Sequence, residues 1–222
     1  RDLPDYREIL HTIWKAVHYC PENHTHQGGA VTVRQGRTVA KKEDTMAEYK
    51  RVRHTFEPVY DDHSSVLILG TFPSVKSREQ NFYYGHPGNR FWRVLAKVTG
   101  QPMPETIEEK RAFLLANGIA LWDVIAECDI AGSSDSSIRN VVPAPLEQVL
   151  FAARIQKIFA NGAKAWELYH RFALPRLLPL LGPDQRETAE HIQKLPSTSP
   201  ANAAWSLDRL AKAWSPVKGL AA

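Results

Sequence analysis

Cysteine is scarce in this sequence, with only Cys20 and Cys128 among 222 residues. Two thiols are too few for a disulfide framework, an all-cysteine zinc site or a four-thiolate iron–sulfur cluster. Cys20 lies among His18, His24 and His26, but one thiol without a second ligand cluster does not complete a tetrahedral zinc site. We therefore predict that the protein needs no metal ion and no cofactor.

Long apolar runs are lacking as well, because no stretch reaches the roughly 18 apolar residues that a membrane-spanning helix requires. The chain also does not open with the basic and then apolar leader that is typical of secreted proteins. We expect a cytoplasmic protein that makes no contact with membranes. Its 43% hydrophobic and 23% charged residues are ordinary for a globular protein with a buried core.

Charge of one sign is in little excess, since 28 Lys and Arg against 24 Asp and Glu give a formal net charge of +4. So small an excess does not indicate a polyanionic partner by itself. The segment from Thr71 to Val98 is more uneven and holds Lys76, Arg78, Arg90, Arg93 and Lys97 against Glu79 alone. This segment is either a solvated basic face or a surface that contacts phosphates.

The first 45 residues differ from the rest of the chain. Residues 5–17 predict one short amphipathic helix, and residues 21–44 are polar without apolar periodicity, which is typical of loop or disorder. We expect residues 1–45 to be a mostly disordered extension that the natural protein need not contain. Residues 46–222, which begin at Met46, are expected to form one domain of ordinary size.

From Met46 onward, short apolar runs alternate with helical patterns. The segments that predict strands are Val66–Gly70, Ile119–Ile125, Ile155–Ala160 and Ala189–Leu195. The segments that predict helices are Asn89–Val98, Glu105–Asn117, Pro145–Ala153, Ala163–Leu178 and Ala203–Trp214. This alternation predicts an α/β three-layer sandwich with a central parallel sheet of about four strands and helices on both faces. Such sheets bind ligands at the carboxyl ends of their strands, where loops 70–89 and 196–202 are expected.

The loop after the first predicted strand combines a tight turn at Gly70 with aromatic and amide side chains over residues 83–92. Aromatic rings stack on flat bases, an amide hydrogen-bonds a ring edge or a water, and basic groups and helix N-termini hold phosphates. The loop therefore suits a pocket for a polar ring attached to a phosphodiester. The alternatives are that Asn89 only caps the next helix and that Phe72, Tyr83 and Tyr84 only pack in the core.

The loop after the last predicted strand, residues 196–202, holds three hydroxyl side chains between two prolines. Such a loop can grip a phosphate, or it can form a hydroxyl-stabilised turn that caps the last helix. Asp123, at the end of the second predicted strand, either orients a water molecule or is a strand-end turn residue. Asp135 lies in a polar loop that either touches DNA or is an ordinary surface loop.

Together these loops resemble those of the uracil-DNA glycosylase superfamily, most closely its hypoxanthine-DNA (deoxyinosine) glycosylase branch. The strings that carry the resemblance are Gly70-Thr71-Phe72-Pro73-Ser74, Tyr84-Gly85-His86-Pro87-Gly88-Asn89-Arg90-Phe91-Trp92 and Leu195-Pro196-Ser197-Thr198-Ser199-Pro200. The resemblance covers roughly Val66 to Trp214 and leaves out the first 45 residues.

Three positions depart from related glycosylases. Phe72 stands where the mismatch-specific uracil glycosylases carry a catalytic Asn, and Leu195 stands where the second motif often opens with His or Asn. Ser199 stands where an apolar wedge is often found. The hypoxanthine branch looks the same at these positions, so the resemblance implies that the essential Asn is Asn89 and that Tyr84 stacks on the base.

The resemblance implies a monofunctional DNA glycosylase of base excision repair that removes hypoxanthine first and uracil second. Its partner is DNA that contains deaminated bases, and we expect a monomer. The predicted roles are catalysis by Asn89, base binding by Phe72, Tyr84 and Gly70, and contact with the DNA backbone by Ser74, Arg90, Arg93, Ser197 and Ser199. Two alternatives stay open: a mismatch-specific uracil-DNA glycosylase, and a non-catalytic nucleic-acid-binding protein on the same fold.

Overall fold

A computed structural model describes residues 48–131 and 135–220 of the chain, all of which lie in one compact unit, Thr45–Ala222. The predicted extension over residues 1–45, with its helix and its His and Cys cluster, lies outside the described residues. Within the described part, no helix has the length and apolar character needed to cross a membrane. The same part of the chain contains no group of three His, Cys, Asp or Glu side chains that could hold a metal ion.

A parallel sheet of four strands lies at the centre of the fold, in the order β3-β2-β6-β7. The strands are β2 (Val66–Gly70), β3 (Ile119–Asp123), β6 (Lys157–Asn161) and β7 (Gln193–Leu195). Every residue of β2 and β3 is buried, as expected for parallel strands that are covered on both faces. The four-stranded parallel sheet that the apolar runs predicted is therefore confirmed.

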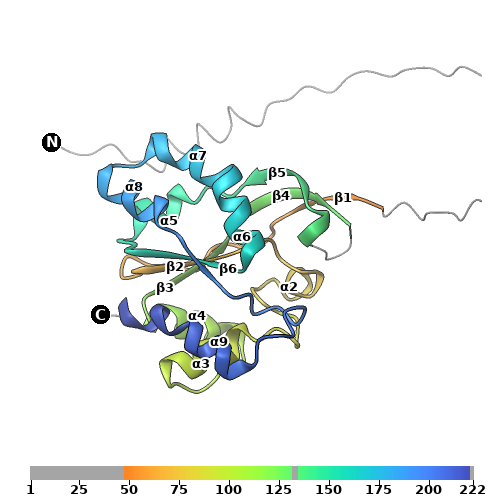
Figure 1. The fold of residues 1–222 in the computed structure, drawn as a ribbon, viewed down its shortest axis with the longest axis vertical. Helices are drawn as coiled ribbons and strands as arrows, with labels where there is room; N and C mark the ends of the chain where they lie inside the picture. Colours follow the sequence, from red (N-terminus) through yellow and green to blue (C-terminus); the bar gives the residue numbers. More distant parts are fainter. Residues whose placement is uncertain (1–47, 132–134, 221–222) are drawn as a thin grey trace, which may run out of the picture. The chain divides into compact units, whose positions relative to one another are not determined.

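Helices cover both faces of this sheet and complete three layers (Figure 1). The helices on one face are α5 (Glu147–Ala152), α6 (Ala163–Leu168), α7 (Leu174–Leu177) and α8 (Pro183–Glu190), and those on the other are α3 (Phe91–Thr99), α4 (Ile107–Ala116) and α9 (Leu207–Ala213). A shorter helix, α2 (Val75–Gln80), follows the turn after β2. Phe91, Val94 and Leu95 of α3 are buried as the pattern predicted. The three-layer α/β prediction is confirmed.

A second, antiparallel sheet of three strands was not predicted. Its strands are β1 (Lys50–Arg53), β4 (Ile125–Ile130) and β5 (Arg139–Pro143), in the order β1-β4-β5. The predicted strand Ile119–Ile125 is in fact two strands, because β3 ends at Asp123 and the chain enters the second sheet at Ile125. The exposed and partly buried residues of these strands break the apolar runs by which the central strands were recognised.

One strand prediction and one helix prediction also needed correction. The segment predicted as the strand Ala189–Leu195 is a strand only over Gln193–Leu195, and α8 ends just before it. Pro183 at the start of α8 fits a first helical turn, where the missing N–H is not needed. The helix predicted over Ala163–Leu178 is present but is interrupted by a π-helical turn, Tyr169–Ala173.

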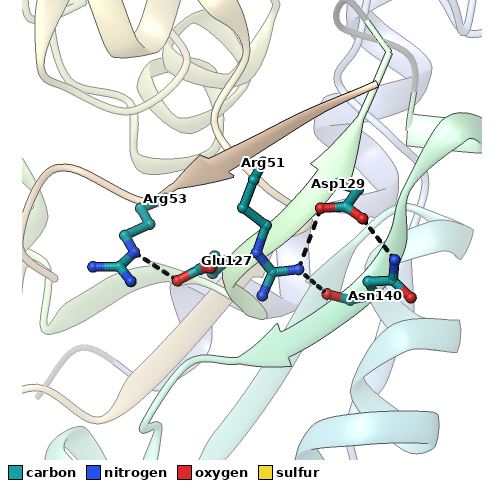
Figure 2. A network of polar contacts seen from close by, with 5 residues as sticks. All are labelled: Arg51, Arg53, Glu127, Asp129 and Asn140. Carbon is teal, nitrogen blue, oxygen red and sulfur yellow. Dashed lines mark hydrogen bonds and ion pairs between the residues drawn. The ribbon is translucent and has the colours of Figure 1, made fainter. Parts of the chain in front are cut away.

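A network of ion pairs holds β1 on the second sheet (Figure 2). The Arg53 guanidinium bonds to Glu127 at 2.7 Å, and Arg51 bonds to Glu127, to Asp129 at 3.4 Å and to the carbonyl of Asn140 at 2.6 Å. Although burial opposes the charge on Glu127, the two guanidinium groups outweigh it and lower the pKa of that carboxyl. His54 directly follows β1, so the network also fixes the position of His54 relative to the second sheet.

Candidate active site

A cavity of about 430 Å³ opens at the carboxyl ends of the central strands, where the two predicted loops meet. The predicted site residues that line it are Gly70, Phe72, Ser74, Tyr84, Asn89, Ser197 and Ser199. Other residues that line it include Asp123, Asp135, Asn161 and Thr198. Arg90 and Arg93 do not line this cavity. The parallel-sheet rule therefore located the cavity correctly, whereas the role of each residue stays a prediction.

Asn89 presents its amide nitrogen and its amide oxygen to different surroundings. The oxygen Oδ1 accepts hydrogen bonds from the Phe91 backbone N–H at 3.0 Å and from the Thr198 hydroxyl at 2.9 Å. Because a backbone N–H can only donate, the oxygen must be the atom that faces Phe91. The Nδ2 amide NH₂ is thereby turned away from Phe91 and Thr198 and has no hydrogen bond to any described residue. The capping interpretation and the catalytic one are compatible, since the oxygen stabilises the start of α3 and the nitrogen is free.

Thr198 bonds directly to Asn89, and Asn161 in turn bonds to Thr198. Thr198 is fully buried, and its hydroxyl accepts a hydrogen bond from Asn161 Nδ2 at 3.0 Å. The Thr198 backbone N–H in turn donates to Asn161 Oδ1, also at 3.0 Å. The sequence analysis did not assign a role to either residue. Asn161 ends β6, so the rule that directed attention to the strand ends was also the signal for this residue.

Asp123 forms a buried pair with His54, which the sequence analysis missed. His54 Nε2 donates to Asp123 Oδ2 over 3.0 Å, and the two side chains are only 5% and 6% exposed. The His54 ring packs edge-on against Phe56 with ring centroids 4.4 Å apart. The other carboxylate oxygen, Oδ1, has no hydrogen bond to a described residue and belongs to a side chain that lines the cavity. No sequence motif marks His54, because it reaches Asp123 only through the pairing of β1 with β4.

Gly70 makes room for Asp123. A Cβ atom at this position would lie 2.1 Å from Asp123 Oδ1 and 3.0 Å from the Tyr84 hydroxyl. The first distance is far below any real contact of a Cβ atom, so any larger residue would displace the carboxylate. The predicted turn therefore has a glycine at this position because the Asp123 carboxylate approaches its backbone closely.

Tyr84 lies between the core and the cavity. Its backbone is in the left-handed region, with φ of 54°, and its ring stacks on Phe91 with centroids 3.9 Å apart. Its hydroxyl is buried beside Asp123 without a well-formed hydrogen bond to a described residue. Burial and then the Asp123 charge raise the pKa of this hydroxyl. Because Phe91 occupies one face of the ring, a base is able to stack only on the other face. Phe72 is 8% exposed, which agrees with mainly a core role.

The three predicted serines each accept a hydrogen bond from a nearby backbone N–H. Ser74 caps α2 through the Ser77 N–H at 3.2 Å, Ser197 accepts from Ser199 at 3.2 Å, and Ser199 accepts from Ala201 at 3.3 Å. Ser74 Oγ also lies 3.0 Å from Ser77 Oγ, and either hydroxyl can be the donor of that bond. The hydroxyls of Ser197 and Ser199 keep their own protons to donate. The turn-forming role is therefore present, and the predicted contact with the DNA backbone stays a prediction.

The two predicted arginines have different surroundings. The Arg90 guanidinium donates to the carbonyl groups of Thr198, Ser199, Asn202 and Trp205. These bonds fasten the loop after β7 to the start of α3, which gives Arg90 a structural role beside the phosphate contact predicted for it. Arg93 is exposed on α3, and its contact with a phosphate stays a prediction.

Comparisons with known proteins agree with this geometry. A sequence model of the Uracil DNA glycosylase superfamily matches residues 57–218 of the chain. A protein of Methanosarcina acetivorans named hypoxanthine DNA glycosylase is 34% identical over 163 residues, which are 71% of this chain and 93% of that protein. A protein of the same name from Methanosarcina barkeri is 38% identical over 114 residues, 50% of this chain and 72% of that protein.

One solved structure is similar over most of the described fold. It is a solution NMR structure of a Methanosarcina acetivorans protein that is described as a candidate uracil DNA glycosylase. Its TM-score to this chain is 0.60 at 31% sequence identity, and the similarity covers 74% of this chain and 96% of that chain. The residues matched by the superfamily, 57–218, contain every predicted site residue, whereas His54 lies just before them.

Proposed function

Because the chain belongs to the uracil-DNA glycosylase superfamily, we propose that it is a DNA glycosylase that removes deaminated bases. It hydrolyses the N-glycosidic bond in DNA that contains hypoxanthine, with uracil as the second substrate, and thereby starts base excision repair. The names of the two Methanosarcina relatives support hypoxanthine as the first substrate.

The observation that carries this proposal is a free donor and a free acceptor in one cavity. The donor is the Nδ2 amine of Asn89, and the acceptor is the Oδ1 oxygen of Asp123. Deamination turns the amine and bare ring nitrogen of adenine or cytosine into a carbonyl and a ring N–H. The Watson–Crick edge thereby exchanges donor for acceptor. With Asn89 on the carbonyl and Asp123 on the ring N–H, the donor and the acceptor complement the deaminated edge. The undeaminated edge would need them in the opposite order.

The reaction develops negative charge on the departing base and positive charge on the sugar. A donor that is already aimed at the carbonyl stabilises the base without reorganisation during the reaction. Asn89 is such a donor because its oxygen is held by Phe91 and Thr198. The sugar cation is stabilised by the neighbouring phosphates, and water is the nucleophile. A flipped deaminated base leaves its mispair at a lower free-energy cost than a paired base.

A glycosylase assay with alkaline strand cleavage tests the proposal. Labelled duplexes carry deoxyinosine, deoxyuridine or only the normal bases at one position. The proposal expects alkali-dependent cleavage at deoxyinosine, less at deoxyuridine and none in the normal duplex. Cleavage mainly at deoxyuridine would favour the mismatch-specific uracil glycosylase. Binding to DNA without base release would favour the non-catalytic protein.

A further inference from the structure

We propose that Thr198 is a positioning residue that holds the Asn89 amide in the orientation in which its amine faces the cavity. The predicted effect on base release rests on the proposed function of this site. The predicted effect on the Asn89 side chain does not, because it follows from the hydrogen bonds alone. Thr198 would then act through Asn89 without touching the base itself.

The donor and acceptor of each hydrogen bond follow from one backbone N–H, that of Thr198, and end at Asn89. The Thr198 backbone N–H can only donate, so it fixes Oδ1 of Asn161 at 3.0 Å. Asn161 Nδ2 must therefore donate to the Thr198 hydroxyl, at 3.0 Å. The hydroxyl proton is then directed to Asn89 Oδ1, at 2.9 Å. Each of these three hydrogen bonds joins one donor to one acceptor. Reversing one of them would leave a buried polar atom unpaired.

The surroundings of Thr198 make the arrangement rigid. The residue is fully buried, and Asn161 is 8% exposed. The Thr198 carbonyl accepts the Arg90 backbone N–H at 3.1 Å, so its main chain and side chain bond to consecutive residues, Arg90 and Asn89. Hydrogen bonds between buried groups such as these are strong, and unpaired buried atoms are costly. Without the hydroxyl, Asn89 Oδ1 would keep only the Phe91 N–H.

The substitutions that test this proposal are Thr198→Val and Thr198→Ser. Valine keeps the shape and loses the hydroxyl, whereas serine keeps the hydroxyl and loses a methyl group. Both changes disturb a buried position, so both are expected to lower the melting temperature. Only valine is expected to slow single-turnover release of hypoxanthine, by about 10- to 100-fold, with unchanged affinity for DNA. Serine is expected to stay within about threefold of the unsubstituted protein, since the hydrogen bond is retained.

The Phe91 backbone amide reports the orientation of Asn89 without any assay of activity. Its N–H signal in a ¹⁵N-correlated NMR spectrum is expected to shift and to exchange faster in Thr198→Val, and to remain in place in Thr198→Ser. Thr99→Val is the control, because the hydroxyl of the half-buried Thr99 bonds, among the described residues, only to the carbonyls of Leu95 and Ala96. The control is expected to leave both the Phe91 signal and the rate unchanged.

A second variant disturbs the same chain of bonds while Thr198 stays in place. Asn161→Asp replaces the amine that donates to the hydroxyl with an acceptor, which draws the hydroxyl proton away from Asn89. The Phe91 signal is expected to move as it does in Thr198→Val. An unchanged Phe91 signal in both variants would overturn the proposal, and so would a serine variant that is as slow as valine. If the unsubstituted protein released no base but the Phe91 signal moved as expected, the proposed function would fail and the positioning would stand.

Discussion

His54 Nε2 donates to Asp123 Oδ2 over 3.0 Å, and this bond joins the antiparallel sheet to the cavity. A carboxylate with so little exposure is costly to bury unless its oxygens are bonded. His54 satisfies one oxygen, and the other has no hydrogen bond to a described residue and belongs to a side chain that lines the cavity. The pair therefore explains why a buried carboxylate persists at the end of β3, and it gives Asp123 a defined orientation.

The role of Asp123 as an acceptor predicts the effect of Asp123→Asn. His54 Nε2 would bond to the new amide oxygen, so the amide NH₂ would face the cavity in place of an acceptor. A ring N–H would then meet a donor, and we expect release of hypoxanthine to slow by about 10- to 150-fold, as for an unpaired buried polar group. Single-turnover rates measure this effect. A rate equal to that of the unsubstituted protein would show that Asp123 does not accept from the base.

The close approach at Gly70 predicts that Gly70→Ala slows base release. The added methyl group would lie 2.1 Å from Asp123 Oδ1 and would displace the carboxylate from its position beside Tyr84. We expect a slower single-turnover rate by about tenfold or more, if about 1.4 kcal/mol of interaction is lost. Gly182→Ala is the matched control, because its Cβ would meet only Gln185 Oε1, at 3.9 Å. Equal activity of the two variants would contradict this account.

The ring and the hydroxyl of Tyr84 have different surroundings, which predicts different results for two substitutions. If a base stacks on the ring, Tyr84→Ala loses a stacking interaction worth about 1–3 kcal/mol, so release should slow by about 5- to 150-fold. Tyr84→Phe keeps the ring and removes a buried hydroxyl without a well-formed partner. We expect its rate to stay near that of the unsubstituted protein and its melting temperature to stay equal or rise. A folded Tyr84→Ala protein with an unchanged rate would remove the stacking claim.

The surroundings of Arg90 and Arg93 predict that the two arginines act differently. Arg90→Met removes the donors of several loop carbonyl groups, so we expect a lower melting temperature. Arg93→Met changes an exposed side chain and should leave the melting temperature unchanged. If Arg93 contacts a phosphate, its loss should reduce the salt slope of DNA binding by about one. Melting curves and salt titrations of both variants measure this, and an unchanged slope for Arg93→Met would exclude the phosphate contact.

The central sheet was predictable because its strands are buried on both faces. Val66–Gly70 appears as one continuous apolar run that ends at a glycine, and the structure places β2 at the same residues. The antiparallel sheet was missed because charged side chains such as Arg51 and Glu127 lie along it. A short run that mixes polar and apolar residues carries no clear period, so only pairing in three dimensions defines these strands.

The cavity was predictable from the loops that line it, but the hydrogen bonds that position its side chains were not. Asn89 and Tyr84 lie in strings that could be recognised along the sequence. The hydrogen bonds of His54 with Asp123 and of Asn161 with Thr198 join residues 69 and 37 positions apart. No local pattern encodes such contacts, since they depend on which strands are neighbours. The sequence therefore indicated which side chains face the cavity better than it indicated which side chains hold them.

The measurement that tests the central claim most directly is single-turnover release of hypoxanthine by Asn89→Ala. The substitution removes the free amide NH₂, the bond to Phe91 and the acceptor of the Thr198 hydroxyl. The lost cap should cost about 1 kcal/mol of stability, and the unpaired buried hydroxyl about 1–3 kcal/mol more. We expect a folded protein that binds deoxyinosine-containing DNA normally and releases the base about 100- to 1,000-fold more slowly, as when one preorganised donor is lost. A folded Asn89→Ala protein whose rate stays within about threefold of the unsubstituted protein, a loss of less than 1 kcal/mol, would contradict the account.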